Sequence, residues 1–293
     1  DAVSLGTARR SALMDQPSCR YLDAGDNGTS ARSAPAIALS RPRWARRADT
    51  WLVMGDWITD PDIVAVEYSS EKSYRERWLA YRELLDGPDD GDIVRQRIVE
   101  AQPARLLDVG SGLGDLCVWA RDEIDTEVFA IDASPRMASL CGQAGAYAAQ
   151  ADIRCLPFTD ASFDCVTACS VLYHVSDPER AIAEAARVLK PDGLFIATTG
   201  SDDEHERLHA WESLFGERIP DYPPQSFSRE NGHDVLLRSF AHVDRVDCDA
   251  ALVFRSREQL VLYMKALVQG ADAADQVPEL SEPFRLPFTA SVF

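Results

Sequence analysis

The sequence predicts an α/β fold built on an open, doubly wound and mostly parallel sheet. A short apolar run at 104–109 leads into a glycine-rich turn, and a helical pattern begins directly after that turn. A second β-favouring run at 128–132 ends in a carboxylate, about 20 residues beyond the glycines. Apolar strands and amphipathic helices then alternate as far as residue 199. This alternation is typical of parallel sheets that carry helices on both faces.

The composition provides ample material for a core. The 293 residues are 46% hydrophobic and carry a formal net charge of −18, which allows one large domain with appendages or two small domains. The acidic balance argues against a nucleic-acid partner, because affinity for phosphate backbones depends on Lys and Arg. No apolar run approaches the roughly 20 residues that span a bilayer. The seven cysteines are scattered and never spaced C-x-x-C, so we expect reduced thiols, no metal site and a cytoplasmic location.

The turn after the first strand contains three glycines at alternate positions, Gly110, Gly112 and Gly114. Glycine is needed where the backbone takes a positive φ, or where a ligand lies too close for a Cβ. The following helix directs its free N–H groups and the positive end of its dipole at the turn, so we expect a ligand with an anionic group there. The spacing differs from the dinucleotide pattern G-x-G-x-x-G, and no G-K-[ST] ending makes this turn a P-loop.

The run 108–114, Asp-Val-Gly-Ser-Gly-x-Gly, resembles the first motif of the class I S-adenosylmethionine-dependent methyltransferases. The resemblance implies a Rossmann-like sheet of seven strands, with a loop that cradles the methionyl part of S-adenosylmethionine. The run 131–137 similarly resembles the second motif, and Asp132 is then the acceptor for both ribose hydroxyls. An Asp after a strand is often only a helix cap, but Ser134 already supplies a helix start here.

The run 151–158 resembles the third motif of the same family, in which Asp152 accepts a hydrogen bond from the adenine amino group and the backbone of Ile153 covers the ring. The alternative is that Asp152 only forms an Asx turn. By this resemblance the cofactor-binding residues are expected to be Asp108, Gly110, Ser111, Gly112, Asp132, Ala133, Met137, Asp152, Ile153 and Cys169.

The segment 170–178, which follows a strand at 163–169, matches the family loop that borders the cofactor methyl group and the substrate. His174 and Tyr173 are the candidate catalytic residues. His174 is the candidate general base because its ordinary pKa lies near neutrality, and the alternative is a structural histidine that binds loop backbone. Tyr173 is the candidate for substrate contact.

Two further segments are expected to shape the substrate site. In the family an insertion after the fifth strand caps the substrate, and here it corresponds to about 200–230, with Trp211 and Phe215 as pocket walls. Aromatic residues also recur at helical spacing near the N-terminus, at Tyr68, Tyr74 and Trp78. They are either ordinary core or, by the same resemblance, part of a helical lid that contributes to the pocket.

The sequence therefore divides into four parts. Residues 1–53 are rich in Arg, Ser and Ala without an apolar period, so we expect a flexible or loosely packed extension. Residues 54–102 form the expected helical lid, and 103–270 the methyltransferase domain. The strands 243–248 and 251–254 are expected to close the sheet as an antiparallel hairpin. The tail 271–293 is expected to pack as an extended arm or to stay mobile.

The expected reaction is in-line displacement, in which an acceptor atom attacks the sulfonium-bound methyl group and S-adenosylhomocysteine is released. The acidic composition, the aromatic lid and the insertion favour a small-molecule acceptor, such as a specialised metabolite, over a macromolecule. One alternative is an RNA or protein methyltransferase, for which a basic face is expected. Another is a catalytically silent protein that binds the cofactor and acts in regulation.

Overall fold

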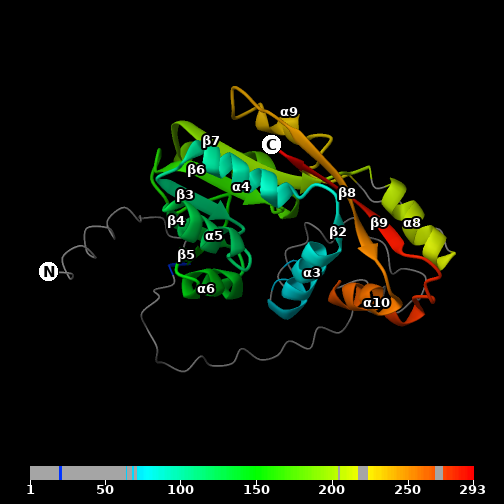
Figure 1. Ribbon diagram of the computed structural model, residues 1–293. Helices are drawn as coiled ribbons and strands as arrows, with labels where there is room; N and C mark the ends of the chain where they lie inside the picture. The colour runs from blue at the N-terminus through cyan, green and yellow to red at the C-terminus, as the bar shows by residue number, and fades with distance from the viewer. Residues whose placement is uncertain are drawn as a thin grey trace.

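The computed structural model describes residues 20–21, 64, 68, 71–203, 205–216, 224–267 and 273–293. Within these residues the strands form one sheet in the order β1-β5-β4-β3-β6-β7-β9-β8-β2 (Figure 1). The neighbours among β3 to β7 are parallel, and β1, β2, β8 and β9 pair antiparallel with their neighbours. The predicted α/β class with a mostly parallel sheet is confirmed.

The strands are β1 (Arg20–Tyr21), β2 (Leu85–Asp86), β3 (Arg105–Val109), β4 (Glu127–Asp132), β5 (Tyr147–Gln150), β6 (Phe163–Cys169), β7 (Leu189–Gly200), β8 (Val246–Phe254) and β9 (Phe284–Val292). The helices are α3 (Glu71–Leu84), α4 (Asp90–Ala101), α5 (Asp115–Ile124), α6 (Pro135–Gln143), α7 (Pro178–Val188), α8 (His205–Phe215), α9 (Gly232–Leu236) and α10 (Arg257–Ala266), with short 3₁₀ turns η3 (Leu172–His174) and η4 (Ala274–Gln276).

The central strands are apolar throughout because both faces of the sheet are covered. Successive side chains of a strand point to opposite faces, and in β3 the fully buried Leu106 and Leu107 belong to two different hydrophobic clusters. Leu106 packs in the cluster that contains Ile98 of α4, together with residues of α5 and α6. Leu107 packs in the cluster that contains Ile182 of α7, together with residues of α9. The helices therefore wind on both faces, as predicted.

The predicted closing hairpin of strands 243–248 and 251–254 is wrong, because these residues do not form two strands that pair with each other. β8 runs without a break through 246–254, and its partner is β9, paired from Val246↔Val292 to Phe254↔Phe284 and inserted between β7 and β8. The tail 271–293 thus supplies a strand of the sheet. Proline normally argues against a strand because it donates no ladder hydrogen bond, and Pro287 lies within β9. No local pattern reveals a partner this far along the chain.

A third hydrophobic cluster lies beyond the parallel part of the sheet, where α3, α8 and α10 meet β8 and β9 (Figure 1). It contains the buried residues Leu84 of α3, Trp211 of α8 and Phe254 of β8. Leu85 of β2 pairs with β8 directly after α3. This cluster places α3 beside the carboxyl ends of the parallel strands, which is where ligands bind in open α/β sheets.

Candidate functional site

The glycine turn adopts the strained backbone that its residue types predict. Gly110, Gly112 and Gly114 all have positive φ, at 69°, 53° and 82°. The backbone N–H of Gly110 donates to the carbonyl of Ile131 at 2.8 Å, which ties the turn to the end of β4. The helix α5 begins directly after the turn, so its N-terminus faces the same space. A side chain at any of these three positions would be strained.

Asp132 lies at the carboxyl end of β4, beside the turn. Its carboxylate accepts hydrogen bonds from the backbone N–H of Gly112 at 3.0 Å and of Ser134 at 2.8 Å. Burial raises its pKa to about 6, against the lowering effect of these two N–H groups. Ser134 caps α6 by accepting from Met137 N–H. A carboxylate offers about four acceptor positions, of which these two hydrogen bonds use two. Asp132 is not among the residues that line the cavity described below.

Aromatic side chains cover this part of the turn. The Tyr74 hydroxyl lies so close to Gly112 that a Cβ there would be 2.9 Å from it. The Tyr68 carbonyl accepts from Ser134 Oγ at 2.9 Å, and the Tyr68 hydroxyl hydrogen-bonds His174 Nε2 at 3.0 Å. The Tyr68 and Tyr74 ring centroids are 5.7 Å apart.

Tyr173 and His174 lie side by side in the turn η3, with ring centroids 4.4 Å apart. His174 therefore contacts the N-terminal segment through Tyr68. Neither Tyr173 nor His174 is among the residues that line the cavity described next.

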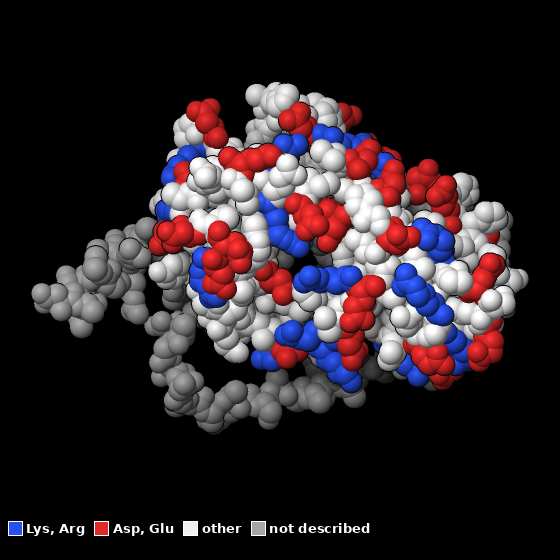
Figure 2. All heavy atoms as spheres, in the orientation of Figure 1, with Lys and Arg blue, Asp and Glu red and all other residues white. Residues whose placement is uncertain are grey.

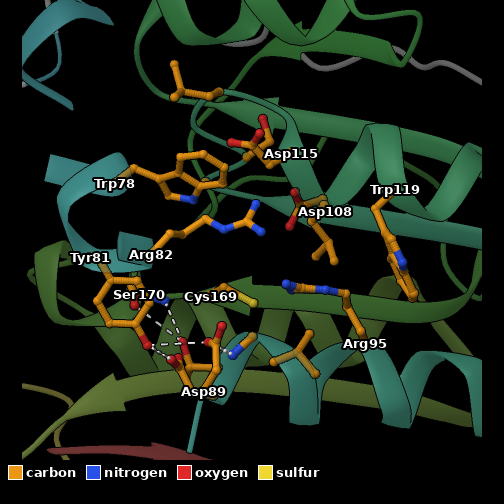
Figure 3. Close-up of a pocket in the computed structure, with 18 of the residues that line it drawn as sticks. Trp78, Tyr81, Arg82, Asp89, Arg95, Asp108, Asp115, Trp119, Cys169 and Ser170 are labelled. Carbon is orange, nitrogen blue, oxygen red and sulfur yellow. Dashed lines mark hydrogen bonds between the residues drawn. The ribbon is translucent and has the colours of Figure 1, made fainter. Parts of the chain in front are cut away.

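A cavity of about 570 Å³ opens between α3, the start of α4 and the glycine turn (Figure 3). Cys169 and Ser170 line it where β6 ends, and Ser170 has a positive φ of 51° that turns the chain there. On this side of the molecule several basic side chains lie beside a hollow near the middle, with acidic side chains next to them, and both signs occur over the rest of the face (Figure 2). We call this space the main cavity. Its lining also includes Tyr74, Trp78, Tyr81, Arg82, Asp89, Asp90, Arg95, Asp108, Gly110, Ser111, Asp115, Trp119, Thr198 and Phe288.

Charges of both signs meet in the main cavity. Arg82 and Arg95 extend into it from opposite sides (Figure 3), and the Arg82 guanidinium stacks on Trp78 with its carbon 5.0 Å from the ring centroid. Asp108 is buried at 3% exposure and accepts from Thr167 Oγ1 at 2.7 Å. Burial raises the pKa of Asp108 to about 6. Cations and carboxylates that line one cavity complement a ligand that carries both charges, such as an amino-acid group.

Tyr81 and Asp90 form a hydrogen-bonded pair at the same cavity. The Tyr81 hydroxyl donates to Asp90 Oδ1 at 2.9 Å, and Asp89 caps α4 by accepting from Gly91 N–H at 2.9 Å. Burial raises the pKa of Asp90 above its ordinary range, against the lowering effect of the Tyr81 hydroxyl. Asp90 thus combines access to the cavity with a carboxylate that holds a proton more readily than usual.

Sequence reasoning missed Tyr81, Arg82, Asp90 and Arg95 as site residues. Tyr81 reads as part of a core stripe, and the two Asp residues of Gly-Pro-Asp-Asp-Gly read as a helix break. One signal was available in the sequence. Arg82 and Arg95 lie in the two helical segments that precede the strand at 104–109. Only the packing of α3 against α4 and the turn shows that they converge.

The expected adenine contact, Asp152, lies apart from the main cavity. Its carboxylate forms a two-pronged ion pair with Arg154, with N···O distances of 3.0 and 2.6 Å. Arg154 also donates to Ser176 Oγ at 3.0 Å. Its neighbour Ile153 is buried in the core. The Asx-turn alternative is also met, because Asp152 Oδ1 accepts from Arg154 N–H at 2.8 Å.

The other expected residues fall in different surroundings. Cys169, Tyr74 and Trp78 line the main cavity. Met137 is completely buried, and Ala133 is exposed with its carbonyl bound by Gln150.

The expected pocket walls Trp211 and Phe215 lie in the third hydrophobic cluster instead of lining the main cavity. Trp211 packs on Phe284 with 5.4 Å between the ring centroids. Phe284 belongs to β9, a strand that was not predicted from the sequence. Within the described residues, no group of three or more His, Cys, Asp or Glu side chains is arranged to hold a metal ion. Among those residues, no helix has the length and apolar character needed to cross a bilayer.

A protein-family model described as a methyltransferase domain matches residues 107–197, from β3 to β7. Residues 107–197 therefore form a methyltransferase domain, in agreement with the resemblance of their motifs to the class I S-adenosylmethionine-dependent methyltransferases. The matched segment contains Asp108, the three glycines, Asp132, Asp152 and His174. It lies almost wholly within the parallel part of the sheet, so the family assignment concerns the cofactor half of the site.

Two curated relatives illustrate the similarity. A 37.1 kDa protein in transposon TN4556 of Streptomyces fradiae is 31% identical over 216 residues, which cover 68% of this chain and 58% of that protein. A malonyl-[acyl-carrier protein] O-methyltransferase of Geobacter sulfurreducens is 31% identical over 159 residues, which cover 50% of this chain and 60% of that protein. The chain therefore spans less than two thirds of the length of either relative. Among solved structures, the YcgJ protein of Bacillus subtilis aligns at 20% identity with a TM-score of 0.43, covering 64% of this chain and 89% of that chain.

Proposed function

We propose that this protein transfers a methyl group from S-adenosylmethionine to a small-molecule acceptor by in-line displacement. The observation that carries the proposal is the arrangement around the glycine turn, with Asp132 on one side and the mixed-charge main cavity on the other. Relatives named as a malonyl-[acyl-carrier protein] O-methyltransferase and a ubiquinone biosynthesis O-methyltransferase also support a non-nucleic-acid acceptor. A specialised metabolite is the acceptor class that we favour.

We assign residues to the ribose and the methionyl parts of the cofactor. Asp132 is assigned to the two ribose hydroxyls, which would use the acceptor positions that Gly112 and Ser134 leave open. Arg82 and Arg95 are suited to the carboxylate of the methionyl group, and Asp108 to its ammonium group. When bound, the cofactor supplies an activated methyl group on a positively charged sulfur. The protein's own contribution is then to hold both partners in line and exclude water.

The transfer forms a bond between the acceptor atom and the methyl carbon and breaks the bond from that carbon to sulfur. An acceptor that arrives protonated must lose its proton to a base. Asp90 is the better placed candidate, because it lines the main cavity and is held by Tyr81. His174 remains the alternative, although its Nε2 is hydrogen-bonded to Tyr68. Both assignments are proposals about the same step.

Cofactor binding is tested by titrating the purified full chain with S-adenosylhomocysteine in a calorimeter. We expect saturable binding and an increase in melting temperature, since a ligand that binds only the folded state stabilises it. Incubation with methyl-labelled S-adenosylmethionine and a small-molecule extract should then give a labelled small product. Absence of any binding would overturn the proposal at its first step.

The two alternatives make different predictions in the same experiments. An RNA or protein methyltransferase should label macromolecules and bind RNA in a salt-dependent gel shift. A catalytically silent regulatory protein should bind S-adenosylhomocysteine but label nothing in any extract. Label in a small molecule excludes both.

The base is assigned by comparing Asp90→Asn with His174→Ala. If Asp90 takes the proton, the loss of rate at low pH should disappear in Asp90→Asn, together with most of kcat, and persist in His174→Ala. The opposite pattern assigns the step to His174. Unchanged S-adenosylhomocysteine binding in both variants is the control for folding.

A further inference from the structure

A second cavity, of about 200 Å³, adjoins the main cavity. The two cavities share four aromatic side chains, those of Tyr74, Trp78, Tyr81 and Phe288. The first three belong to α3, and Phe288 belongs to β9. Residues of the glycine turn line the main cavity but not the second one. The four aromatic side chains therefore mark the border between the two cavities.

The second cavity has a mostly aromatic lining. Five of its eight lining residues are aromatic and one, Leu252, is aliphatic. Leu252 of β8 and Tyr263 of α10 line this cavity but not the main one, and both are buried. Arg77 and Arg207 complete the lining. An apolar group that enters this cavity is removed from water, which favours its binding.

The aromatic rings around the second cavity are held by contacts within the protein. The Tyr81 hydroxyl donates to Asp90 Oδ1 at 2.9 Å, and the Tyr81 and Phe288 rings meet edge to face with 5.0 Å between their centroids. The Tyr263 ring packs on Phe254 with 5.2 Å between the centroids. Because these rings have fixed partners, the cavity is preformed, and a ligand does not have to order its walls.

The volume and the lining favour one aromatic ring as the occupant. An engineered apolar cavity of about 150 Å³ binds benzene, so a cavity of about 200 Å³ accommodates one ring with a short substituent. Aromatic rings that meet edge to face or in offset stacks attract each other beyond the effect of the buried area. A saturated ring or an alkyl chain lacks this contribution. The five aromatic residues of the lining therefore favour an aromatic ring over either of them.

We propose that the second cavity binds a single aromatic ring of the methyl acceptor, and that a substituent of this ring carries the acceptor atom past Tyr81 into the main cavity. The inference rests on the proposed methyltransferase function and names the class of its substrate, a small molecule with one aromatic ring.

The position of Asp90 agrees with this arrangement. Asp90 lines the main cavity and is bound by Tyr81, which lines both cavities. A substituent that passes Tyr81 therefore enters the main cavity beside the carboxylate proposed to take the proton. The ring itself stays on the far side of the border, away from the glycine turn.

The test uses protein saturated with S-adenosylhomocysteine and three alcohols with equal numbers of carbon atoms, benzyl alcohol, cyclohexylmethanol and n-heptanol. Ligand-observed NMR titration measures their affinities. We expect benzyl alcohol to bind roughly twofold to tenfold more tightly than either of the other alcohols. Removal of apolar area from water predicts the reverse order, because the two saturated alcohols are the more hydrophobic. The order of affinities therefore separates an aromatic site from a merely apolar one.

Variants of Leu252 locate the ring. Leu252→Phe adds volume at a residue that lines only the second cavity, so benzyl alcohol affinity should fall about tenfold, while S-adenosylhomocysteine affinity stays within about twofold. Leu252→Ala enlarges the cavity and should raise the affinity for naphthylmethanol relative to benzyl alcohol. Leu286→Ala is the matched control, because Leu286 pairs with Leu252, belongs to the same hydrophobic cluster and does not line the cavity. It should lower the melting temperature without changing the order of affinities.

Equal or tighter binding of the saturated alcohols to the unmodified protein would overturn the inference, whether or not the variants fold. Benzyl alcohol binding that Leu252→Phe leaves unchanged would also overturn it, because the ring would then lie elsewhere. Failure of S-adenosylhomocysteine to bind would instead overturn the proposed function. Titration of the protein alone with the three alcohols would in that case still decide whether the second cavity binds an aromatic ring.

Discussion

The β4 end and the β6 and β7 end of the carboxyl edge of the sheet are built in different ways. At the β4 end, one carboxylate, Asp132, is fixed by backbone N–H groups of Gly112 and Ser134 within a short stretch of chain. At the β6 and β7 end, the main cavity gathers side chains from α3, α4 and α5, which pack together only in the folded protein. The first end uses local backbone geometry, and the second depends on tertiary packing.

This difference indicates which part of the ligand each end recognises. Backbone N–H groups and a buried carboxylate form a rigid acceptor, suited to a group that is the same in every cofactor molecule. The main cavity presents Arg82, Arg95 and Asp115 on the helices α3, α4 and α5, so the positions of these charges depend on how the helices pack against the sheet. We therefore expect the β4 end to contribute most to cofactor affinity, and the main cavity to contribute less to cofactor affinity while it also binds the acceptor.

The largest expected effect is at Asp132. Asp132→Ala removes the acceptor for two ribose hydroxyls, and because a hydrogen bond to a charged group contributes about 1.5–3 kcal/mol, S-adenosylhomocysteine affinity should fall roughly 100-fold or more. Calorimetry on Asp132→Ala and Asp132→Asn measures this loss, with melting temperature as the check on folding. Near-normal affinity in the alanine variant would remove the assigned role of the β4 end.

A smaller effect is expected at the other end. Arg82→Gln and Arg95→Gln each remove a cation that we assign to the methionyl carboxylate, so affinity should fall by about tenfold in either variant and become less dependent on salt. Adenosine lacks this carboxylate and serves as the control ligand. Its affinity should not change in either variant, and a parallel loss for adenosine would show that the arginines act only through the structure.

The same contrast explains what the sequence reveals and what it hides. The strand, turn and carboxylate at 104–132 are continuous in the chain, so residue types and spacing predict them, as they predict the Ser134 helix cap. Arg82 and Arg95 have no such signature, because they lie on different helices, α3 and α4, that both line the cavity only in the folded protein. β9 was missed for a related reason, since its pairing partner is remote and Pro287 obscures its pattern.

Affinity should also depend on pH, with a sign set by Asp132. Burial raises its pKa to about 6, and the ionised carboxylate is the form that accepts two hydroxyls. S-adenosylhomocysteine affinity should therefore be constant above about pH 7 and fall roughly tenfold by pH 5 as the carboxyl becomes protonated. Calorimetry across this range measures the fall. In Asp132→Asn, a pH dependence of affinity that remains is attributed to Asp108, whose pKa is also raised to about 6. An affinity that does not change with pH in the unmodified protein would contradict the role assigned to Asp132.

The smallest effect is expected at Asp152, even though its motif is one of those that suggest the cofactor. Its carboxylate is half-exposed and already paired with Arg154, and exposed ion pairs contribute only about 0–1 kcal/mol. An adenine amino group would exchange one partner for another, so Asp152→Ala should lower S-adenosylhomocysteine affinity by no more than about fivefold. Arg154→Gln is the informative partner variant, because it releases the carboxylate and should leave affinity unchanged or slightly higher. A loss of a hundredfold in Asp152→Ala would mean that Arg154 gives way to adenine on binding, and that the adenine end is as decisive as the ribose end.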